Sequence, residues 1–430
     1  MMTAAGDRNY TRLLSSDVTL QAVSMHSNLS TGPALPGPAP TIGIFRRLAV
    51  LACTTVSLLH AGIASAQSAW DYGDRGLEWS DGTTGSYLWL GLRAQFRYST
   101  NINDLRLPED FEEDADAGGR VNRSRYKVGA GYRNDFTFYH EYDLRDRRLL
   151  DLRATWVANP SINLRVGQWK ADYNRARIDS SGKQQFAERS IATYWFTIDR
   201  QWGVMMSGRL WQGSGLDSNW WGGILGGNGR SEADDGGRPM LMGRWQWNYT
   251  GNSLPFSQSA LKRYSRPHAS LAFGAVANDS RYTRFSSDGG GQLPGYVHGE
   301  QNQYRIYQAM QEWAWQHQGL SFQQELHWKS VEDRREGGTR HLFGGYAQVG
   351  WFPADRWQSV PEQLELALRA AYVDADSAAN LEQTELSVAV NWFFSGHRNK
   401  VTLDGAYISA EDRADKESDY RLQLQWEISI

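Results

Sequence analysis

Sixteen short stretches in which apolar and polar residues alternate run from Tyr87 to Ile430, and each is followed by a turn or a polar loop. Such alternation places the apolar residues on one face of a β-strand and the polar residues on the other. In the final stretch, the apolar set is Tyr420, Leu422, Leu424, Trp426, Ile428 and Ile430, and the polar set is Arg421, Gln423, Gln425 and Glu427. A half-buried sheet of a soluble domain would alternate too. The repetition, without one convincing amphipathic helix, predicts an all-β antiparallel barrel.

The predicted strands number sixteen, an even count that suits an antiparallel barrel and allows a water-filled lumen. The first eight are expected near residues 87–98, 121–131, 134–145, 149–158, 162–171, 200–211, 219–226 and 240–250. The second eight are expected near residues 267–278, 303–315, 319–330, 340–352, 363–374, 383–394, 399–409 and 419–429.

The aromatic content indicates a membrane setting for this barrel. The 430-residue chain has 19 Trp, 20 Tyr and 15 Phe, although its mean hydropathy is only −0.59. A transmembrane β-barrel reconciles the two, because aromatic residues occupy its lipid-facing band and interfacial girdles while its lumen is polar. No stretch reaches the roughly 20 apolar residues of a membrane helix. The sequence therefore predicts that strands span the membrane.

The first 66 residues are predicted to be an N-terminal extension and a secretory signal peptide that is removed. Phe45-Arg46-Arg47 precedes an apolar run from Leu48 to about Ile63, and Ala64-Ser65-Ala66 follows it. This is the order of charge, apolar region and small-residue cleavage site in a signal peptide. A membrane anchor is the alternative. Residues 67–430 are then the barrel, with a net charge of −5, which argues against bulk nucleic-acid binding, and without cysteine.

The connections tend to alternate in length, as they do in outer-membrane barrels with long external loops and short periplasmic turns. Residues 99–120 and 172–199 form long connections, while 316–318 and 396–398 form short ones. The turn at 251–266 is too long for this rule, and the loop at 146–148 is too short. The segment 171–200 follows the fifth strand, and loops of this length are uncommon unless they are functional. We expect it to fold into the lumen as a constriction loop, with an external lid as the alternative.

Arginine supplies 38 of the 45 basic residues, and many arginines fall on the inward phase of the strands. The arginine side chain is planar and permanently charged, and it can donate two hydrogen bonds to one oxyanion. A basic lumen therefore favours anions. The alternative is that these cations only pair with inward acids such as Glu141, Asp143, Asp151, Glu325 and Glu365. The residues expected inside from the first eight strands are Arg93, Arg97, Arg123, Arg125, Lys127, Arg153, Arg165, Arg209 and Arg244. Many other acids fall in the expected outer loop, at residues 109–116.

Enzymatic readings have little support in the sequence. His140, the clearest histidine of the barrel wall, falls on the lipid-facing phase of the third strand, where it could not serve a phospholipase site in the lumen. The glycines between Gly222 and Gly229 are not followed by the Gly-Lys-Ser/Thr of a phosphate loop. No cluster has the spacing of a metal site, so no cofactor is expected. A structural or adhesive barrel is a third class, which absence of conductance would reveal.

A family resemblance emerges from motifs in a fixed order along the chain. Asn122-Arg123-Ser124-Arg125, followed by Phe136-x-Phe138-x-x-Glu141-Tyr142-Asp143, resembles the second-to-third strand segment of the phosphate- and polyphosphate-selective porins, the O/P family. Val166-Gly167-Gln168-Trp169-Lys170 and Ala187-Glu188-Arg189-Ser190 are similar to the fifth strand and the constriction-loop motif of that family. Together with later motifs, these matches cover nearly the whole mature chain.

The resemblance implies a trimeric 16-stranded channel of the Gram-negative outer membrane, with arginine ladders and a basic constriction. Transferred onto the matching positions, it implies a constriction role for Arg123, Arg125 and Arg189, and it adds Lys170 to the anion pathway. We therefore expect a porin that passes small, phosphate-like anions passively, in contact with outer-membrane lipid and lipopolysaccharide. The alternative is a weakly selective general porin for other small hydrophilic solutes.

Overall fold

The computed structural model describes residues 69–101, 118–232, 238–285, 290–375, 381–411 and 416–430. The predicted leader at residues 1–66 and the acidic outer loop at 109–116 lie outside these residues. Among the described residues, no helix is both long and apolar enough to cross a membrane.

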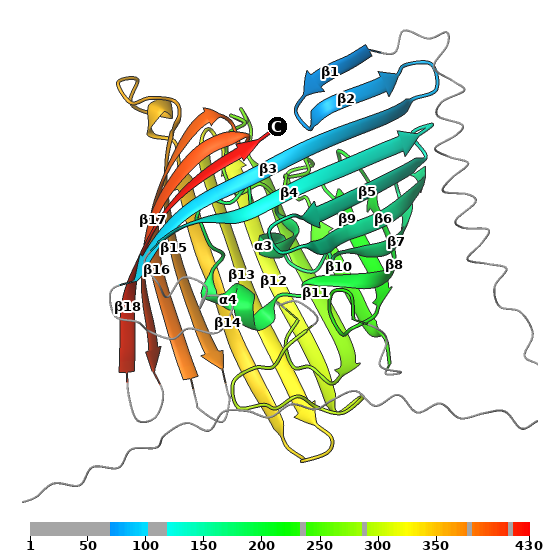
Figure 1. The fold of residues 1–430 in the computed structure, drawn as a ribbon, viewed down its shortest axis with the longest axis vertical. Helices are drawn as coiled ribbons and strands as arrows, with labels where there is room; N and C mark the ends of the chain where they lie inside the picture. Colours follow the sequence, from blue (N-terminus) through cyan, green and yellow to red (C-terminus); the bar gives the residue numbers. More distant parts are fainter. Residues whose placement is uncertain (1–68, 102–117, 233–237, 286–289, 376–380, 412–415) are drawn as a thin grey trace, which may run out of the picture. The chain divides into compact units, whose positions relative to one another are not determined.

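Sixteen antiparallel strands, β3 to β18, form a closed transmembrane barrel, as predicted (Figure 1). Each strand pairs with its neighbour in sequence, β9 pairs with β10, and β18 closes the ring on β3. The first eight strands are β3 (Ser86–Asn101), β4 (Gly118–Tyr132), β5 (Phe136–Asp143), β6 (Arg148–Asn159), β7 (Ile162–Lys170), β8 (Arg200–Leu210), β9 (Ser218–Leu225) and β10 (Met240–Trp247). The others are β11 (His268–Ser280), β12 (Tyr304–His317), β13 (Leu320–Asp333), β14 (Thr339–Trp351), β15 (Leu364–Ala375), β16 (Leu381–Ser395), β17 (Asn399–Glu411) and β18 (Lys416–Ser429).

The two-residue alternation separates the faces of the wall as the sequence predicts. On β18, Leu422 and Trp426 are 50% and 44% exposed, whereas Gln423 and Gln425 between them are 0% and 2% exposed. Large apolar side chains are exposed in the same phase on the other strands, where they face lipid.

A hairpin precedes the barrel and was not predicted. It consists of β1 (Ala69–Gly73) and β2 (Gly76–Asp81). β2 pairs with the first residues of β3, from Ser86 to Leu90, and β18 pairs with the remainder of β3 from Arg93 onward. The main-chain N–H and C=O of Ile430 both bond to Leu92. The hairpin therefore continues the wall where β18 ends.

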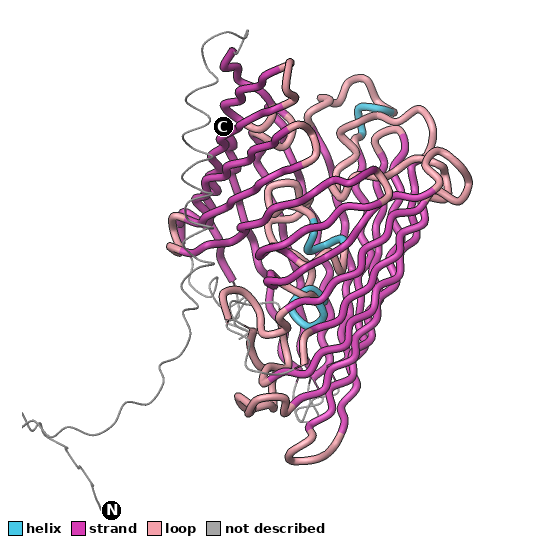
Figure 2. Tube along the Cα trace, turned by 90° about the vertical axis from the view of Figure 1, so that its right-hand side faces the viewer, coloured by secondary structure: helices cyan, strands magenta, loops and turns pink. Residues whose placement is uncertain are grey.

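The connection at residues 171–199, called the constriction loop below, folds into the lumen as predicted. It contains α3 (Arg175–Ile178) and α4 (Ile191–Phe196), and both helices lie within the height of the strands (Figure 2). Every side chain of α4 is buried, and the helix contacts β13 to β16.

Besides many buried polar side chains, the lumen contains an apolar cluster, which the expectation of a polar interior did not include. Trp195 and Phe196 of α4 are at most 1% exposed and pack with inward side chains such as Met310, Tyr346 and Val373. Apolar residues at inward positions have little to bury in an open pore, but here the constriction loop supplies the apolar partner.

The long turn between β10 and β11, at residues 248–267, also folds inward. Leu254, Gln258 and Ala260 are buried, and the Ser257 hydroxyl lies 2.9 Å from His397 Nε2 in the β16–β17 turn. A short 3-10 helix, η1 (Pro353–Asp355), occupies the turn between β14 and β15. The excess length of the β10–β11 turn therefore fills the lumen from that end.

Candidate functional site

A cavity of about 700 Å³ lies between the constriction loop and the barrel wall. Its walls come from β4, from the β5–β6 loop, from the constriction loop, and from the β9–β10 and β11–β12 loops. The described residues that line it include eleven basic and three acidic side chains. The basic ones are Arg120, Arg123, Arg125, Arg145, Arg148, Lys170, Arg177, Arg189, Arg200, Arg230 and Arg284, and the acidic ones are Asp146, Glu188 and Asp199.

A β-bulge on β4 brings an additional arginine to the inner face. Gln95 of β3 pairs with Arg123 and Phe96 pairs with Val121, so that Asn122 is the extra residue. A bulge shifts the alternation by one residue. Arg120 therefore faces inward together with Arg123 and Arg125, although simple alternation would send it to the lipid face.

The register places arginines opposite each other on β3 and β4. Arg93 pairs with Arg125, and Arg97 pairs with Arg120. Like charges directly opposite on neighbouring strands are destabilising. This arrangement costs stability in the wall, so it points to a requirement for positive charge at this position.

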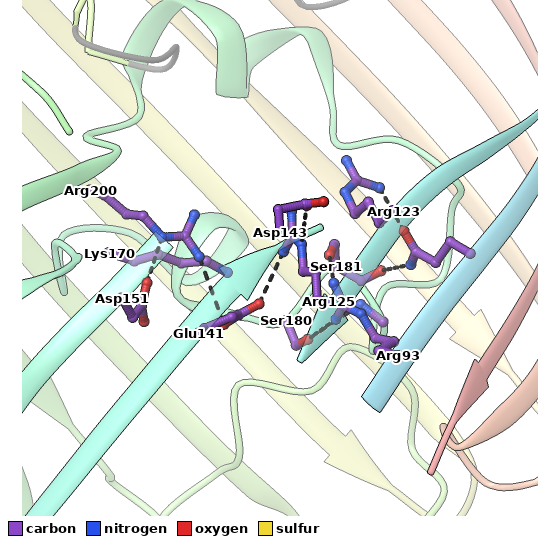
Figure 3. A network of polar contacts seen from close by, with 12 residues as sticks. Arg93, Arg123, Arg125, Glu141, Asp143, Asp151, Lys170, Ser180, Ser181 and Arg200 are labelled. Carbon is purple, nitrogen blue, oxygen red and sulfur yellow. Dashed lines mark hydrogen bonds and ion pairs between the residues drawn. The ribbon is translucent and has the colours of Figure 1, made fainter. Parts of the chain in front are cut away.

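Neighbouring polar groups hold these guanidinium groups in place (Figure 3). Arg93 donates to the hydroxyls of Ser180 and Ser181 in the constriction loop, both at 2.8 Å. Arg123 donates to Gln95 Oε1 at 2.8 Å. The loop and the wall therefore fix each other's side chains.

Acids on this wall are covered by arginines. Arg125 bonds to Asp143 at 2.7 Å and to Glu141 at 3.2 Å. Arg200 bonds to Asp151 at 2.5 Å, and the two carboxylates of Glu141 and Asp151 are at most 6% exposed. The inward acids thus lie next to the cations, and Figure 3 shows Glu141 in contact with both Arg125 and Arg200.

Cations of the constriction loop are held by the loop's own carbonyl groups. Arg189 Nε donates to Ala176 O at 2.7 Å and Nη2 to Asp179 O at 3.1 Å, and Lys170 Nζ donates to Asp179 O at 3.0 Å. Both side chains line the cavity. Arg97 forms an ion pair with Glu188 of the loop.

Two acids of the constriction loop, Asp179 and Glu188, differ in their charge state. Burial raises the pKa of the Asp179 carboxyl to about 6, against the opposing effect of Lys170, Lys183 and Arg189. Burial also acts to raise the pKa of Glu188, but the neighbouring guanidinium groups of Arg97 and Arg123 outweigh it and lower the pKa to about 2. Glu188 is therefore ionised throughout the physiological range, whereas Asp179 titrates close to it.

Other predicted pathway residues lie elsewhere on the barrel. Lys127, Arg153 and Arg165 are half-buried on the inner face of β4, β6 and β7, outside the cavity lining. Arg209 pairs with Asp217 in the β8–β9 turn at 2.5 Å. Arg244 is fully buried and bonds to Glu312 and to Tyr173 O, at 3.0 and 2.9 Å. Of the predicted set, only Arg123, Arg125, Lys170 and Arg189 line the cavity.

The two sides of the barrel differ in exposure. Several inward side chains of β4 to β7, among them Lys127, Tyr139 and Thr155, are half-buried. Inward side chains along β13, β15 and β16 are buried beneath the constriction loop and the β10–β11 turn. The accessible inner surface therefore follows β4 to β7.

The sequence matches, over residues 92–425, the protein family described as phosphate-selective porin O and P. The chain belongs to this family. The porin has the fold of the anion-selective porin from Comamonas acidovorans, with a TM-score of 0.53, 11% identity, and coverage of 80% of this chain and 100% of that one. The outer-membrane protein OmpT of Vibrio cholerae is similar too, with a TM-score of 0.50, 9% identity, and coverage of 84% and 100%. Among curated proteins, none matches the sequence.

This porin is a passive channel of the outer membrane. Seven cavity cations escaped the sequence prediction: Arg120, Arg145, Arg148, Arg177, Arg200, Arg230 and Arg284. Arg120 was missed because the bulge shifts the alternation by one residue. Arg230 and Arg284 belong to or adjoin loops, whose path into the cavity no periodicity reveals. The run from Arg145 to Arg148 in a very short loop was the one local signal available.

Proposed function

We propose that this porin passes small, phosphate-like anions in preference to cations. The observation that carries the proposal is the cavity between the constriction loop and the barrel wall, where eleven basic side chains face three acidic ones among the described lining residues. A concave site lined by one sign of charge concentrates counter-ions and speeds their entry. An anion that passes the constriction loop would meet this field.

The spacing of Arg123 and Arg125 supports stepwise passage. Their Cα atoms lie about 7 Å apart along one inward face, because side chains repeat on a strand every second residue. Each guanidinium offers forked donors to an oxyanion. Since the surrounding lumen is wet, binding stays weak enough for the anion to move on to the next site, as conduction requires.

A weakly selective general porin is the second candidate, and a specific observation favours it. Several wall arginines already bond to acids, as Arg125 does to Asp143 and Arg200 to Asp151. An ion pair presents less net charge to a permeating solute than a lone cation does. The selectivity of the channel decides between the two candidates.

The test is the reversal potential of the channel in planar bilayers under a salt gradient. We expect anion preference in the wild type, and a shift toward cations in Arg123→Ala, in Arg125→Ala and most strongly in the double variant. Arg263→Ala is the matched control, because Arg263 pairs with Asp355 outside the cavity. A double variant with wild-type selectivity would make the general porin the better account.

We also propose that the chain forms a homotrimer surrounded by outer-membrane lipid and lipopolysaccharide, after removal of the leader at Ala66. Family membership and the exposed apolar wall support this proposal. Unheated and heated samples compared by gel electrophoresis would give the oligomeric state. Mass spectrometry of the purified porin would give its first residue, for which Gln67 or its cyclised form is expected.

A further inference from the structure

Six buried carboxylates that the constriction loop covers face inward from strands between β12 and β18. None of them is more than 3% exposed. They are Glu312 on β12, Glu325 on β13, Glu365 on β15, Glu385 on β16, Asp404 on β17 and Glu427 on β18. Four buried cations, Lys329, Arg369, Lys400 and Arg421, face inward from the same strands, and Arg369 pairs with Glu385. The acids outnumber them, so an open wall would carry a net negative charge and attract cations, and its burial bears directly on selectivity.

Main-chain N–H groups of the constriction loop bond to four of these acids. Arg175 N donates to Glu312 at 3.1 Å, and Ala176 N donates to Glu325 at 2.7 Å. The N–H groups of Ala187 and Ile191 donate to Asp404 and Glu385, at 2.6 and 2.9 Å respectively. Hydrogen bonds to ionised acceptors are stronger than neutral ones, so each contact fastens the loop to the wall.

Side chains and a glycine of the loop cover Glu365 and Glu427 and add a second contact to Glu325. Asn174 Nδ2 donates to Glu325 at 2.9 Å, and Gln185 Nε2 donates to Glu365 at 2.8 Å. Gly182 lies so close to Glu427 that an added Cβ would be 1.9 Å from Oε1. The loop thus follows the acidic wall from β12 to β18.

The loop itself contributes little net charge. Between residues 172 and 198 it carries four basic and three acidic side chains. One net positive charge is small beside the six carboxylates that the loop covers. The electrostatic effect of the loop on the channel comes mainly from the wall acids that it covers.

We propose that the constriction loop is an electrostatic shield: it removes an acidic wall from contact with permeating ions and leaves the basic wall of β4 to β7 as the conducting surface. This inference rests on the proposed anion preference and gives it a structural origin. It accounts for an anion channel built from a chain whose formal net charge is −3.

The test combines removal of the loop with removal of the acids. The loop ends adjoin, since Ala171 N bonds to Asp199 O at 3.4 Å, so a short Gly-Ser linker can replace residues 172–198. The acids are neutralised without loss of size in the triple variant Glu325→Gln, Glu365→Gln and Asp404→Asn. Reversal potentials are measured for the wild type, each change alone and the combination.

We expect the triple variant with the loop intact to keep wild-type selectivity, because the acids are masked. Loop removal should lower the anion-to-cation permeability ratio severalfold, and the combination should restore much of it. Unchanged selectivity after loop deletion would refute the shield. A loss of selectivity that neutralising the acids does not restore would refute it too, and pore widening would then explain the loss. Increased anion preference of the triple variant with the loop intact would refute masking as well.

A second variant and the wild-type measurement complete the test. If the deletion does not fold, Ala176→Pro with Ala187→Pro removes two N–H donors to the wall acids while retaining the loop, and the same shift toward cations is expected. The wild-type measurement alone tests the anion preference. A wild type without that preference contradicts the proposed function, whereas the shift caused by unmasking the acids tests the shield separately.

Discussion

Asp179 illustrates how a single buried acid can tune the channel. Its carboxyl is 3% exposed inside the constriction loop, and its carbonyl oxygen receives both Arg189 and Lys170. Burial holds its pKa at about 6, above the ordinary value of 3.8. Because folding raises the pKa of the Asp179 carboxyl, ionisation of this group lowers the free energy of unfolding. This loss of stability is absent below the ordinary pKa and reaches its full value above pH 6.

Lowering the pH from 7 to 5 should therefore increase anion preference, since Asp179 loses the negative charge that partly offsets its neighbours Lys170 and Arg189, which line the cavity. Asp179→Asn should show the acidic-pH selectivity already at pH 7. The measured quantity is the difference between the pH profiles of wild type and variant, because all other titratable groups are the same in both. Identical pH profiles of the reversal potential would contradict an effect of Asp179.

Gly167 on β7 has a backbone conformation that other residues rarely adopt. Its φ is 124°, and an added Cβ would lie 2.2 Å from the carbonyl oxygen of Leu152 on β6. We expect Gly167→Ala to destabilise the barrel by ~1–3 kcal/mol. The readout is the temperature at which the folded band disappears in gel electrophoresis. Gly222→Ala is the control, because its Cβ would meet no atom within 4 Å; equal melting of both variants would contradict the argument.

At the scale of elements, the β1–β2 hairpin stands out because it lengthens the wall next to the β18–β3 seam. Five residue pairs join β2 to β3, from Leu77 with Leu90 to Asp81 with Ser86. Arg75 in the hairpin turn lies over the rings of Tyr87 and Trp89, at 5.2 and 5.7 Å. The hairpin therefore stabilises the start of β3, which β18 does not cover.

Deletion of residues 69–82 should leave a folded channel with a lower melting temperature, because the start of β3 loses its paired neighbour. Conductance should be unchanged, since the hairpin does not line the cavity. Trp70→Ala with Tyr72→Ala is the control that keeps the strand pairing. An unchanged melting temperature after deletion would show that the hairpin adds no stability.

The sequence predicted the barrel strands better than it predicted the lumen. All sixteen strands were predicted, because lipid on one side and lumen on the other impose the two-residue alternation. The hairpin was missed, since Trp70 and Tyr72 precede the region where the pattern repeats. Arg120 was missed because a bulge breaks the phase. Contacts such as Ala187 N with Asp404 join residues 217 positions apart, and no local pattern encodes them.

At the scale of the whole channel, the accessible part of the inner wall carries more basic than acidic side chains. Arg123, Arg125 and Lys127 on β4 are half-buried, whereas Glu325 and Glu365 on β13 and β15 are at most 1% exposed. The solute therefore meets a wall much more basic than the composition suggests. Net charge of a chain is a poor guide to the selectivity of its pore.

Strand polarity fixes which connections face outward. Counting from β18, which ends in the periplasm in such barrels, the β13–β14 loop is external and the β16–β17 turn is periplasmic. A tag inserted at Gly337 should be labelled on intact cells, and one at Gly396 should be labelled only after lysis. Neither glycine has an atom within 4 Å of an added Cβ, so both sites have space. Labelling of Gly396 on intact cells would invert the topology.

The aromatic side chains of the constriction loop have a consequence for biogenesis. Trp195 and Phe196 are fully buried within the ring of strands. If the loop docks on the open sheet before β18 meets β3, it covers apolar surface that would otherwise promote aggregation. We therefore expect the loop to dock early in assembly and the ring to close around it.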